Sequence, residues 1–152
     1  MDFEVRAACD GDADGMSRVI LWALRHTNAK DYPSHVIERI GLSFTPATML
    51  ELLGKRRVFV AVTADRIVGT ASLDGNLVRT VFIAPDMQRR GIGRLLMAEI
   101  DQAARRAGLD VLTVPSSVTA EGFYSRLGFR AVRDHYHGDE RTIIMERDLH
   151  RS

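Results

Sequence analysis

The chain has 152 residues, which is about the length of one domain. Hydrophobic residues make up 45% and charged residues 27%, a balance typical of a folded globular protein. The net charge of +1 argues against a protein that coats nucleic acid or a membrane surface. The single cysteine, Cys9, excludes an internal disulfide framework and a zinc site built mainly on cysteine, and we expect it to be buried. Without a signal-peptide layout or an apolar run of about 18 residues, we expect one cytoplasmic domain over residues 1–152.

The first third of the chain predicts one strand followed by three helices. Apolar and polar residues alternate over positions 3–7, which is typical of a strand. Asp12 and Thr45 are good N-cap residues, and Gly54 is a natural helix end. The helices expected from the spacing of apolar residues and from these end signals span residues 12–27, 36–40 and 45–54.

The rest of the chain predicts a meander of strands, then helices that alternate with strands. Turn signals at residues 63–65 and 74–76 separate the strands of the meander, and Gly108 and Gly128 each end a helix. Residues 134–141 are polar and are expected to form a loop between the last two strands. The expected strands cover residues 58–62, 67–73, 77–83, 111–114, 129–132 and 142–145, and the expected helices cover residues 91–107 and 119–127.

The segment between the strand at 77–83 and the following helix is the most informative one for function. A helix N-terminus offers unpaired backbone N–H groups and a partial positive charge, which suits a phosphate. Gly91 and Gly93 at that helix start let a ligand approach the backbone closely. Positive charge is added at the same place by Arg89, Arg90 and Arg94.

Two other interpretations of this segment are a solvated basic turn and a nucleotide-binding loop. No third glycine follows Gly93 at the spacing of a dinucleotide fingerprint, and no Gly-Lys-Ser/Thr sequence is present. The pattern therefore disfavours a Rossmann site and a P-loop. A generic anion-binding α/β domain remains an alternative.

Two motifs resemble the GNAT superfamily of acyl-CoA-dependent N-acetyltransferases. Residues 88–93, Gln-Arg-Arg-Gly-Ile-Gly, match its Gln/Arg-x-x-Gly-x-Gly/Ala pyrophosphate motif, and residues 120–129 are similar to its Ala-x-x-Phe-Tyr-x-x-x-Gly-Phe motif. The resemblance covers essentially the whole chain. One departure is Gly122, where relatives often carry proline or a larger residue; it removes no chemical group.

The resemblance implies a single-domain α/β (α+β) fold with a mixed sheet of six to seven strands. That sheet is splayed between its fourth and fifth strands and carries helices on both faces. Acetyl-CoA is the implied co-substrate, with its pantetheine arm along the strand at 77–83 and no metal. The implied cofactor-binding residues are Val81, Phe82, Ile83, Gln88, Arg89, Arg90, Gly91, Ile92, Gly93, Arg94 and Ser117.

The same resemblance implies direct transfer of an acetyl group to a primary amine in a ternary complex. Tyr124 is the candidate acid for the departing thiolate, and a backbone N–H near residues 82–83 would serve the oxyanion. Ser117 either caps the helix that follows it or binds the cofactor, and capping is favoured. The base stays open among several groups: Asp74, His26, His35, His135 and His137.

The acceptor is expected to be a small molecule or a peptide amine, with no nucleic acid and no membrane as partner. Tyr32, in a loop beside a proline, is the candidate substrate-binding residue, while Trp22 and Phe44 fall in the helical region that forms the acceptor wall in the superfamily. For Trp22, packing is the favoured role. A homodimer is a family-level expectation. The main alternative function is a non-catalytic acyl-CoA-binding sensor with the same fold.

Overall fold

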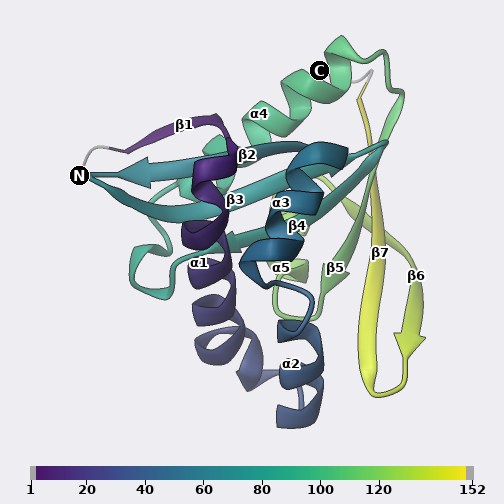
Figure 1. Ribbon diagram of the computed structural model, residues 1–152. Coiled ribbons are helices and arrows are strands. Elements are labelled where there is room, and N and C mark those ends of the chain that lie inside the picture. Colours follow the sequence, from purple (N-terminus) through teal and green to yellow (C-terminus); the bar gives the residue numbers. More distant parts are fainter. Residues whose placement is uncertain (1–2, 150–152) are drawn as a thin grey trace.

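The computed structural model describes residues 3–149, which form one seven-stranded sheet covered by helices (Figure 1). The strand order is β1-β2-β3-β4-β5-β7-β6. The strands are β1 (Glu4–Ala7), β2 (Arg57–Thr63), β3 (Arg66–Asp74), β4 (Leu77–Ile83), β5 (Val111–Ser117), β6 (Arg130–His137) and β7 (Glu140–Asp148). The α-helices are α1 (Ala13–His26), α2 (Ser34–Gly41), α3 (Pro46–Lys55), α4 (Ile92–Arg106) and α5 (Glu121–Arg126). Short 3-10 turns are η1 (Asp10–Asp12), η2 (Asn28–Lys30) and η3 (Pro85–Met87).

The sheet is mixed, and it splits between β4 and β5, which are the only parallel neighbours among the described strands. β4 and β5 run parallel and are paired at a single position, Leu77 with Thr113. All other neighbouring strands are antiparallel and pair along most of their length. The mixed sheet splayed between its fourth and fifth strands is therefore confirmed.

Helices cover both faces of the sheet, as predicted. In Figure 1, α1 and α3 lie in front of the strands while α4 lies behind them. The buried stripe of α4 is spaced as an amphipathic helix requires, with Ile92, Leu96 and Ile100 each no more than 1% exposed. The methionines of residues 3–149 belong to the core, with Met16, Met49, Met87, Met97 and Met145 all at most 2% exposed.

The predicted helix ends at Thr45, Gly108 and Gly128 are confirmed, the end at Gly54 is wrong, and Asp12 takes the N-cap position of α1 without the expected capping hydrogen bond. Thr45 caps α3, accepting a hydrogen bond from the Thr48 N–H (3.2 Å). Gly54 lies inside that helix, which continues to Lys55. Asp12 precedes α1 but makes no cap hydrogen bond to it.

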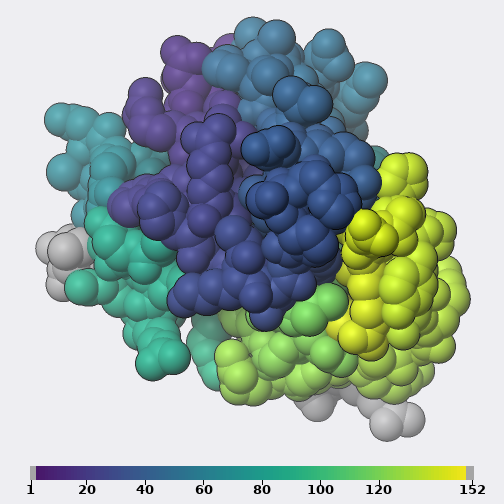
Figure 2. Space-filling model, turned by 90° about the horizontal axis from the view of Figure 1, so that it is seen from below, coloured from purple at the N-terminus to yellow at the C-terminus, as the bar shows by residue number. Residues whose placement is uncertain are grey.

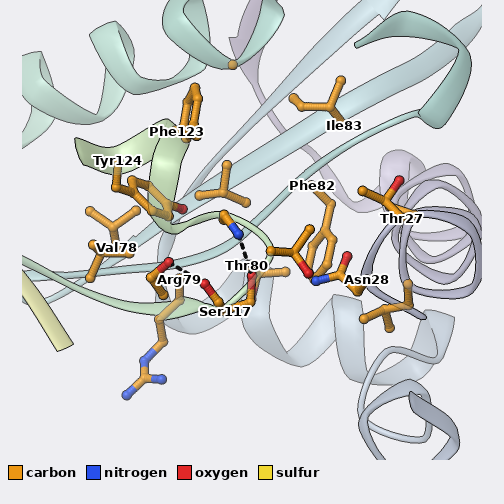
Figure 3. A pocket seen from close by; sticks show the side chains of 18 of the residues that line it. Thr27, Asn28, Val78, Arg79, Thr80, Phe82, Ile83, Ser117, Phe123 and Tyr124 are labelled. Atoms are coloured by element: carbon orange, nitrogen blue, oxygen red, sulfur yellow. Dashed lines mark hydrogen bonds between the residues drawn. The ribbon is translucent and has the colours of Figure 1, made fainter. Parts of the chain in front are cut away.

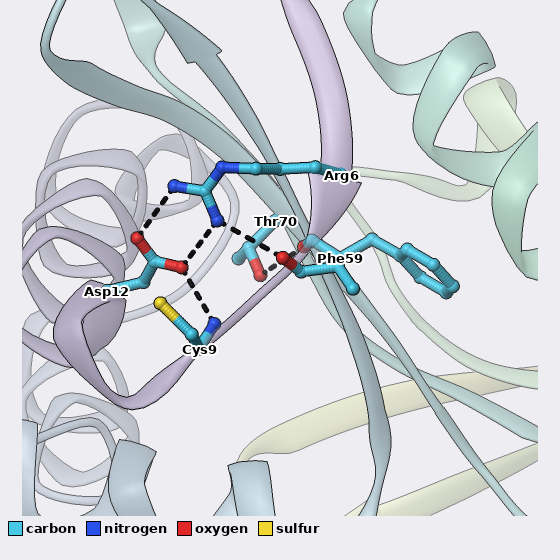
Figure 4. Close-up of polar contacts among 6 residues, drawn as sticks. Arg6, Cys9, Asp12, Phe59 and Thr70 are labelled. Carbon is cyan, nitrogen blue, oxygen red and sulfur yellow. Dashed lines mark hydrogen bonds and ion pairs between the residues drawn. The ribbon is translucent and has the colours of Figure 1, made fainter.

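The Asp12 carboxylate instead closes the turn between β1 and α1 (Figure 4). It accepts two hydrogen bonds from the Arg6 guanidinium (2.8 and 3.0 Å) and one from the Cys9 N–H (2.8 Å). Arg6 holds the pKa of Asp12 below its ordinary value, chiefly through these hydrogen bonds. Cys9 is exposed in this turn, so the expectation that it is buried is wrong.

The C-terminal part of the sheet differs from the sequence-based expectation. Residues 134–141 are mostly strand rather than loop, because β6 continues to His137 and β7 begins at Glu140 after a turn at Gly138 (φ 60°). All eight residues of β6 are exposed, so this strand shows none of the hydrophobic alternation that marks a strand in a sequence. It is held as a strand by its backbone pairing to β7.

Within residues 3–149, no helix is long and apolar enough to cross a membrane. The same residues contain no cluster of three or more histidine, cysteine or acidic side chains that could hold a metal ion.

Candidate active site

The site begins with an irregularity in β4. The pairing of β4 with β3 shifts between Thr70 and Ser72, and Thr80 at this bulge has a positive φ of 56°. Such a backbone conformation is rare for a β-branched residue. The Thr80 hydroxyl accepts a hydrogen bond from Arg56 Nη1 (3.1 Å). The bulge lies just before residues 81–83, where β4 has parted from β5.

A cavity of about 940 Å³ opens along this free edge of β4. Tyr124 and Phe123 lie on one side of it, Thr27 and Asn28 on the other, and Phe82 between them (Figure 3). The cavity brings together nearly all the predicted site residues: Tyr32, Val81, Phe82, Ile83, Gln88, Arg89, Gly91, Ile92, Gly93, Arg94, Ser117 and Tyr124. Arg90 is the exception, since it is exposed and does not line the cavity.

The two glycines at the start of α4 have different structural roles. Gly91 has a φ of 83°, and a Cβ added there would meet no atom within 4 Å, so its backbone is open to a ligand. A Cβ added at Gly93 would come within 2.9 Å of the Phe123 ring. Gly93 therefore allows α5 to pack closely on α4. Arg89 also has a positive φ, 65°, which turns the chain into the helix.

Tyr124 of α5 is 3% exposed and packs between two aromatic rings. Its ring meets those of Phe123 and Phe129 edge-on, with centroids 5.1 and 5.6 Å away. Burial raises the pKa of its phenol well above the ordinary value. Figure 3 shows the hydroxyl pointing into the cavity, and no described residue hydrogen-bonds to it.

The hydroxyl groups of Tyr32 and Ser117 both take part in hydrogen bonds within the protein. The Tyr32 hydroxyl accepts from the Val118 N–H (2.7 Å) and donates to the Arg141 carbonyl (2.9 Å). Ser117 Oγ accepts from the Ala120 N–H (3.1 Å) and so closes the turn before α5; it does not cap that helix, whose N-cap residue is Ala120. Tyr32 thus lines the cavity while its hydroxyl holds two backbone segments together.

Polar contacts join the α1–α2 segment to the other side of the cavity. Thr119 donates to Asp31 (2.7 Å), and Arg39 forms an ion pair with Glu140 (3.2 Å). Figure 2 shows this segment, in blue, lying against the green and yellow atoms of the β5–α5 region and the β6–β7 hairpin. The cavity is therefore bounded by segments from both ends of the chain.

None of the predicted base candidates is among the described residues that line the cavity. Asp74 is placed between two arginines, 3.7 Å from Arg56 Nε and 3.5 Å from Arg79 Nε. His35 pairs with Asp139 at the surface, at 2.9 Å. The histidines at positions 26, 135 and 137 also lie outside the cavity lining.

Several cavity residues were missed by sequence reasoning. Arg56 belongs to a run of basic residues after α3 that reads as a solvated surface, yet its side chain is only 15% exposed and burial lowers its pKa. Arg79, Asn28 and Glu140, which belong to no motif, also line the cavity, as does Arg126 at a variable position of the 120–129 motif. Their positions depend on the packing of segments far apart in the sequence.

Trp22 packs partly buried against the core, as favoured from the sequence, and does not line the cavity. Phe44 does line it, and its ring meets that of Phe82 edge-on at 5.8 Å. The wall of the cavity opposite α5 is therefore partly aromatic.

Comparisons with known proteins agree with this arrangement. A family described as "Acetyltransferase (GNAT) domain" matches residues 28–144. The chain is 25% identical over 132 residues to the "Uncharacterized N-acetyltransferase YafP" of Escherichia coli strain K12, covering 87% of this chain and 84% of that one.

Among the solved structures that share the fold are two N-acetyltransferases. One is a GCN5-related N-acetyltransferase from Rhodopseudomonas palustris, with a TM-score of 0.91, 21% identity, and 97% of this chain and 96% of that chain covered. The other is the PaiA N-acetyltransferase from Thermoplasma acidophilum in complex with coenzyme A, with a TM-score of 0.83, 18% identity, and 97% and 99% covered. With a family match over residues 28–144, this chain belongs to the GNAT family of acetyltransferases.

Proposed function

We propose that this protein transfers the acetyl group of acetyl-CoA directly to a primary amine, with both substrates bound at once. The observation that carries the proposal is one continuous cavity, which joins the basic loop before α4 to Tyr124 along the free edge of β4. That shape suits a substrate with a diphosphate at one end and a thioester at the other. The coenzyme A complex of the relative from Thermoplasma acidophilum supports this assignment.

The diphosphate of acetyl-CoA would lie at the N-terminus of α4. The first N–H groups of a helix lack partners within it and carry a partial positive charge. Arg89 and Arg94 line the cavity here and supply charge-assisted hydrogen bonds. At Gly91 no side chain separates the ligand from the backbone.

The pantetheine arm would extend along β4 like an added strand. The Ala84 N–H donates to the Val68 carbonyl on β3 (2.8 Å). Because backbone groups alternate in direction along a strand, those of Ile83 and Val81 face away from β3, towards the free edge. These groups can pair with the amides of the arm.

The transfer step forms an N–C bond and breaks the thioester C–S bond. The amine nitrogen attacks the carbonyl carbon, and a backbone N–H near Ile83 donates to the developing oxyanion, a contribution of about 3–4 kcal/mol for such a donor. The C–S electron pair leaves with sulfur, and the Tyr124 hydroxyl gives its proton to the thiolate. The amine's surplus proton goes to water, and Tyr124 regains a proton from solvent.

The amine must be neutral to attack. Because the predicted base candidates lie outside the cavity lining, we propose that water removes the ammonium proton before the attack. The rate should then rise with pH through the pKa of the acceptor amine.

Thermal melting tests the cofactor assignment. Acetyl-CoA and CoA at about 100 times their Kd should raise the Tm by roughly 5–10 °C, and NAD or ATP should not. Gly91→Glu should abolish the shift, because it places bulk and negative charge against the diphosphate. Gly108→Glu is the matched control, because Gly108 also has a positive φ (76°) and open space but lies at the far end of α4. Stabilisation by NAD or ATP and not by CoA would refute the assignment.

The transferase assignment is tested by the release of CoA thiol from acetyl-CoA in the presence of a panel of primary amines. Amine-dependent release is expected. Binding of acetyl-CoA without release by any amine would instead indicate a non-catalytic acyl-CoA sensor.

A further inference from the structure

Two arginines share one carboxylate in the part of the cavity next to the start of β4. Arg56 and Arg79 both line the cavity, and Asp74 lies 3.7 Å from Nε of the first and 3.5 Å from Nε of the second. Both separations are too long for a hydrogen bond. Because two guanidinium groups face a single carboxylate, the cluster of Arg56, Arg79 and Asp74 has an excess of positive charge.

Hydroxyl groups, rather than a carboxylate, hold the Arg56 guanidinium in place. Its Nη1 donates to Ser72 Oγ (3.3 Å) and to Thr80 Oγ1 (3.1 Å). The side chain is 15% exposed, whereas that of Asp74 is 46% exposed and partly solvated. Asp74 neutralises Arg56 only in part, because their ion pair is long, is shared with Arg79 and involves a half-exposed carboxylate. A ligand carboxylate bound directly to the Arg56 guanidinium would complete the pairing.

The contact with Thr80 places this charge close to the site of transfer. Thr80 lies at the bulge that directly precedes residues 81–83, where the acyl end of the cofactor would lie. Only a short spacer can therefore separate the anionic group of an acceptor from its amine. Phe44, Leu52 and Val78 also line the cavity and suit an apolar side chain.

We propose that the acceptor is a free amino acid with an apolar side chain, whose carboxylate is bound by Arg56. This inference rests on the proposed acetyltransferase function. Arg79, which also lines the cavity and lies 3.5 Å from Asp74, adds positive charge beside Arg56. Guanidinium binds a carboxylate in a planar, two-point geometry, which gives orientation as well as affinity.

The test compares L-leucine with L-leucinamide, which lacks the carboxylate. CoA release is measured for the wild type, Arg56→Gln and Arg57→Gln. Arg57 is the matched control, because it is the next residue, is exposed, and does not line the cavity. The two amines differ in basicity, so the quantity compared is the change in each kcat/KM between variants.

Arg56→Gln should lower kcat/KM for leucine by about 10- to 100-fold, which is the range for the loss of a hydrogen bond to a charged group. The same substitution should change kcat/KM for leucinamide by less than about twofold. Arg57→Gln should leave both unchanged. A parallel fall for both amines in Arg56→Gln would overturn the proposal, because it would mean that Arg56 only supports the Thr80 bulge.

Calorimetry separates this proposal from the proposed function. Leucine should bind the CoA-saturated wild type more tightly than it binds the CoA-saturated Arg56→Gln variant. Equal or undetectable leucine binding in both refutes the carboxylate site, even if other amines are acetylated. Failure of acetyl-CoA itself to bind refutes the proposed function instead.

Discussion

The hydroxyl of Tyr32 accepts a 2.7 Å hydrogen bond from the N–H of Val118, a residue 86 positions later in the chain. The same hydroxyl donates to the Arg141 carbonyl (2.9 Å). One side chain from the helical region thereby holds the β5–α5 turn and the start of β7 around the cavity. Tyr32, a candidate for substrate binding from the sequence alone, has a structural contact that the sequence does not reveal.

Tyr32→Phe should destabilise the protein, because it leaves a part-buried N–H and a carbonyl without their partner. The expected loss is about 1–3 kcal/mol in the free energy of unfolding, measured by urea denaturation. The acceptor KM should rise while acetyl-CoA affinity stays nearly constant. Tyr136→Phe is the control, since Tyr136 is 62% exposed on β6. Equal stability of the two variants would contradict the bridging role of Tyr32.

Tyr124→Phe should lower kcat by about 100-fold, which is typical of the loss of a general acid, with little change in acetyl-CoA affinity. Burial raises the pKa of this phenol above its ordinary value of about 10, so it remains protonated over the usual assay range. For the wild type, kcat/KM should therefore rise with pH as the amine loses its proton and show no alkaline fall up to about pH 9.5. Stopped-time assays of CoA release at several pH values check both expectations. An unchanged kcat in the variant would show that another group protonates the thiolate.

Gly93→Ala should impair catalysis by displacing Phe123, whose ring would lie 2.9 Å from the new Cβ. Phe123 packs directly on Tyr124, so a shift of its ring misplaces the hydroxyl. We expect kcat to fall by roughly 10-fold or more, since small displacements of reacting groups are costly.

The control for that substitution is Gly54→Ala. A Cβ at Gly54, inside α3, meets no atom within 4 Å, so this change should stabilise the protein by about 0.5–1 kcal/mol through helix propensity. If both variants keep full activity, the close packing of α5 on α4 does not position Tyr124.

Asp12→Asn should weaken the protein at neutral pH and have little effect in acid. Arg6 lowers the pKa of Asp12 in the folded state, so the contribution of this carboxylate is complete above its unfolded value of about 3.9 and is lost as pH falls through the folded value. The expected loss is about 1–3 kcal/mol at pH 7, from urea midpoints. At about pH 3 and below, the gap between variant and wild type should narrow. Glu51→Gln, at an exposed position of α3, should show no such pH dependence.

Structural features that depend on residues close together in the sequence were predicted well. The order of helices and strands, the Thr45 cap and the split between β4 and β5 are all present. The segment at 88–94 and Tyr124 do line one cavity, with Arg90 as the exception. These predictions rest on periodicity, end signals and two short motifs, which are local properties of the chain.

The predictions that failed concern burial and pairing. Cys9 is exposed although its N–H donates to the buried Asp12 carboxylate, and Asp12 is engaged by Arg6 rather than by α1. Residues 134–141 contain strand because β7 provides a partner, although both faces of β6 remain exposed. Pairing energy from a neighbouring strand has no counterpart in the local hydrophobic pattern.

By itself, the sequence determined the family, the element order and the phosphate-binding character of the segment before α4, since these depend on contiguous residues. Only the tertiary structure decided that Arg56 reaches Thr80 inside the cavity and that Tyr32 joins Val118 to Arg141. Those contacts unite residues separated by 24 to 109 positions. They exist because β4 and β5 part after one pair, so that the helical region can close over the gap.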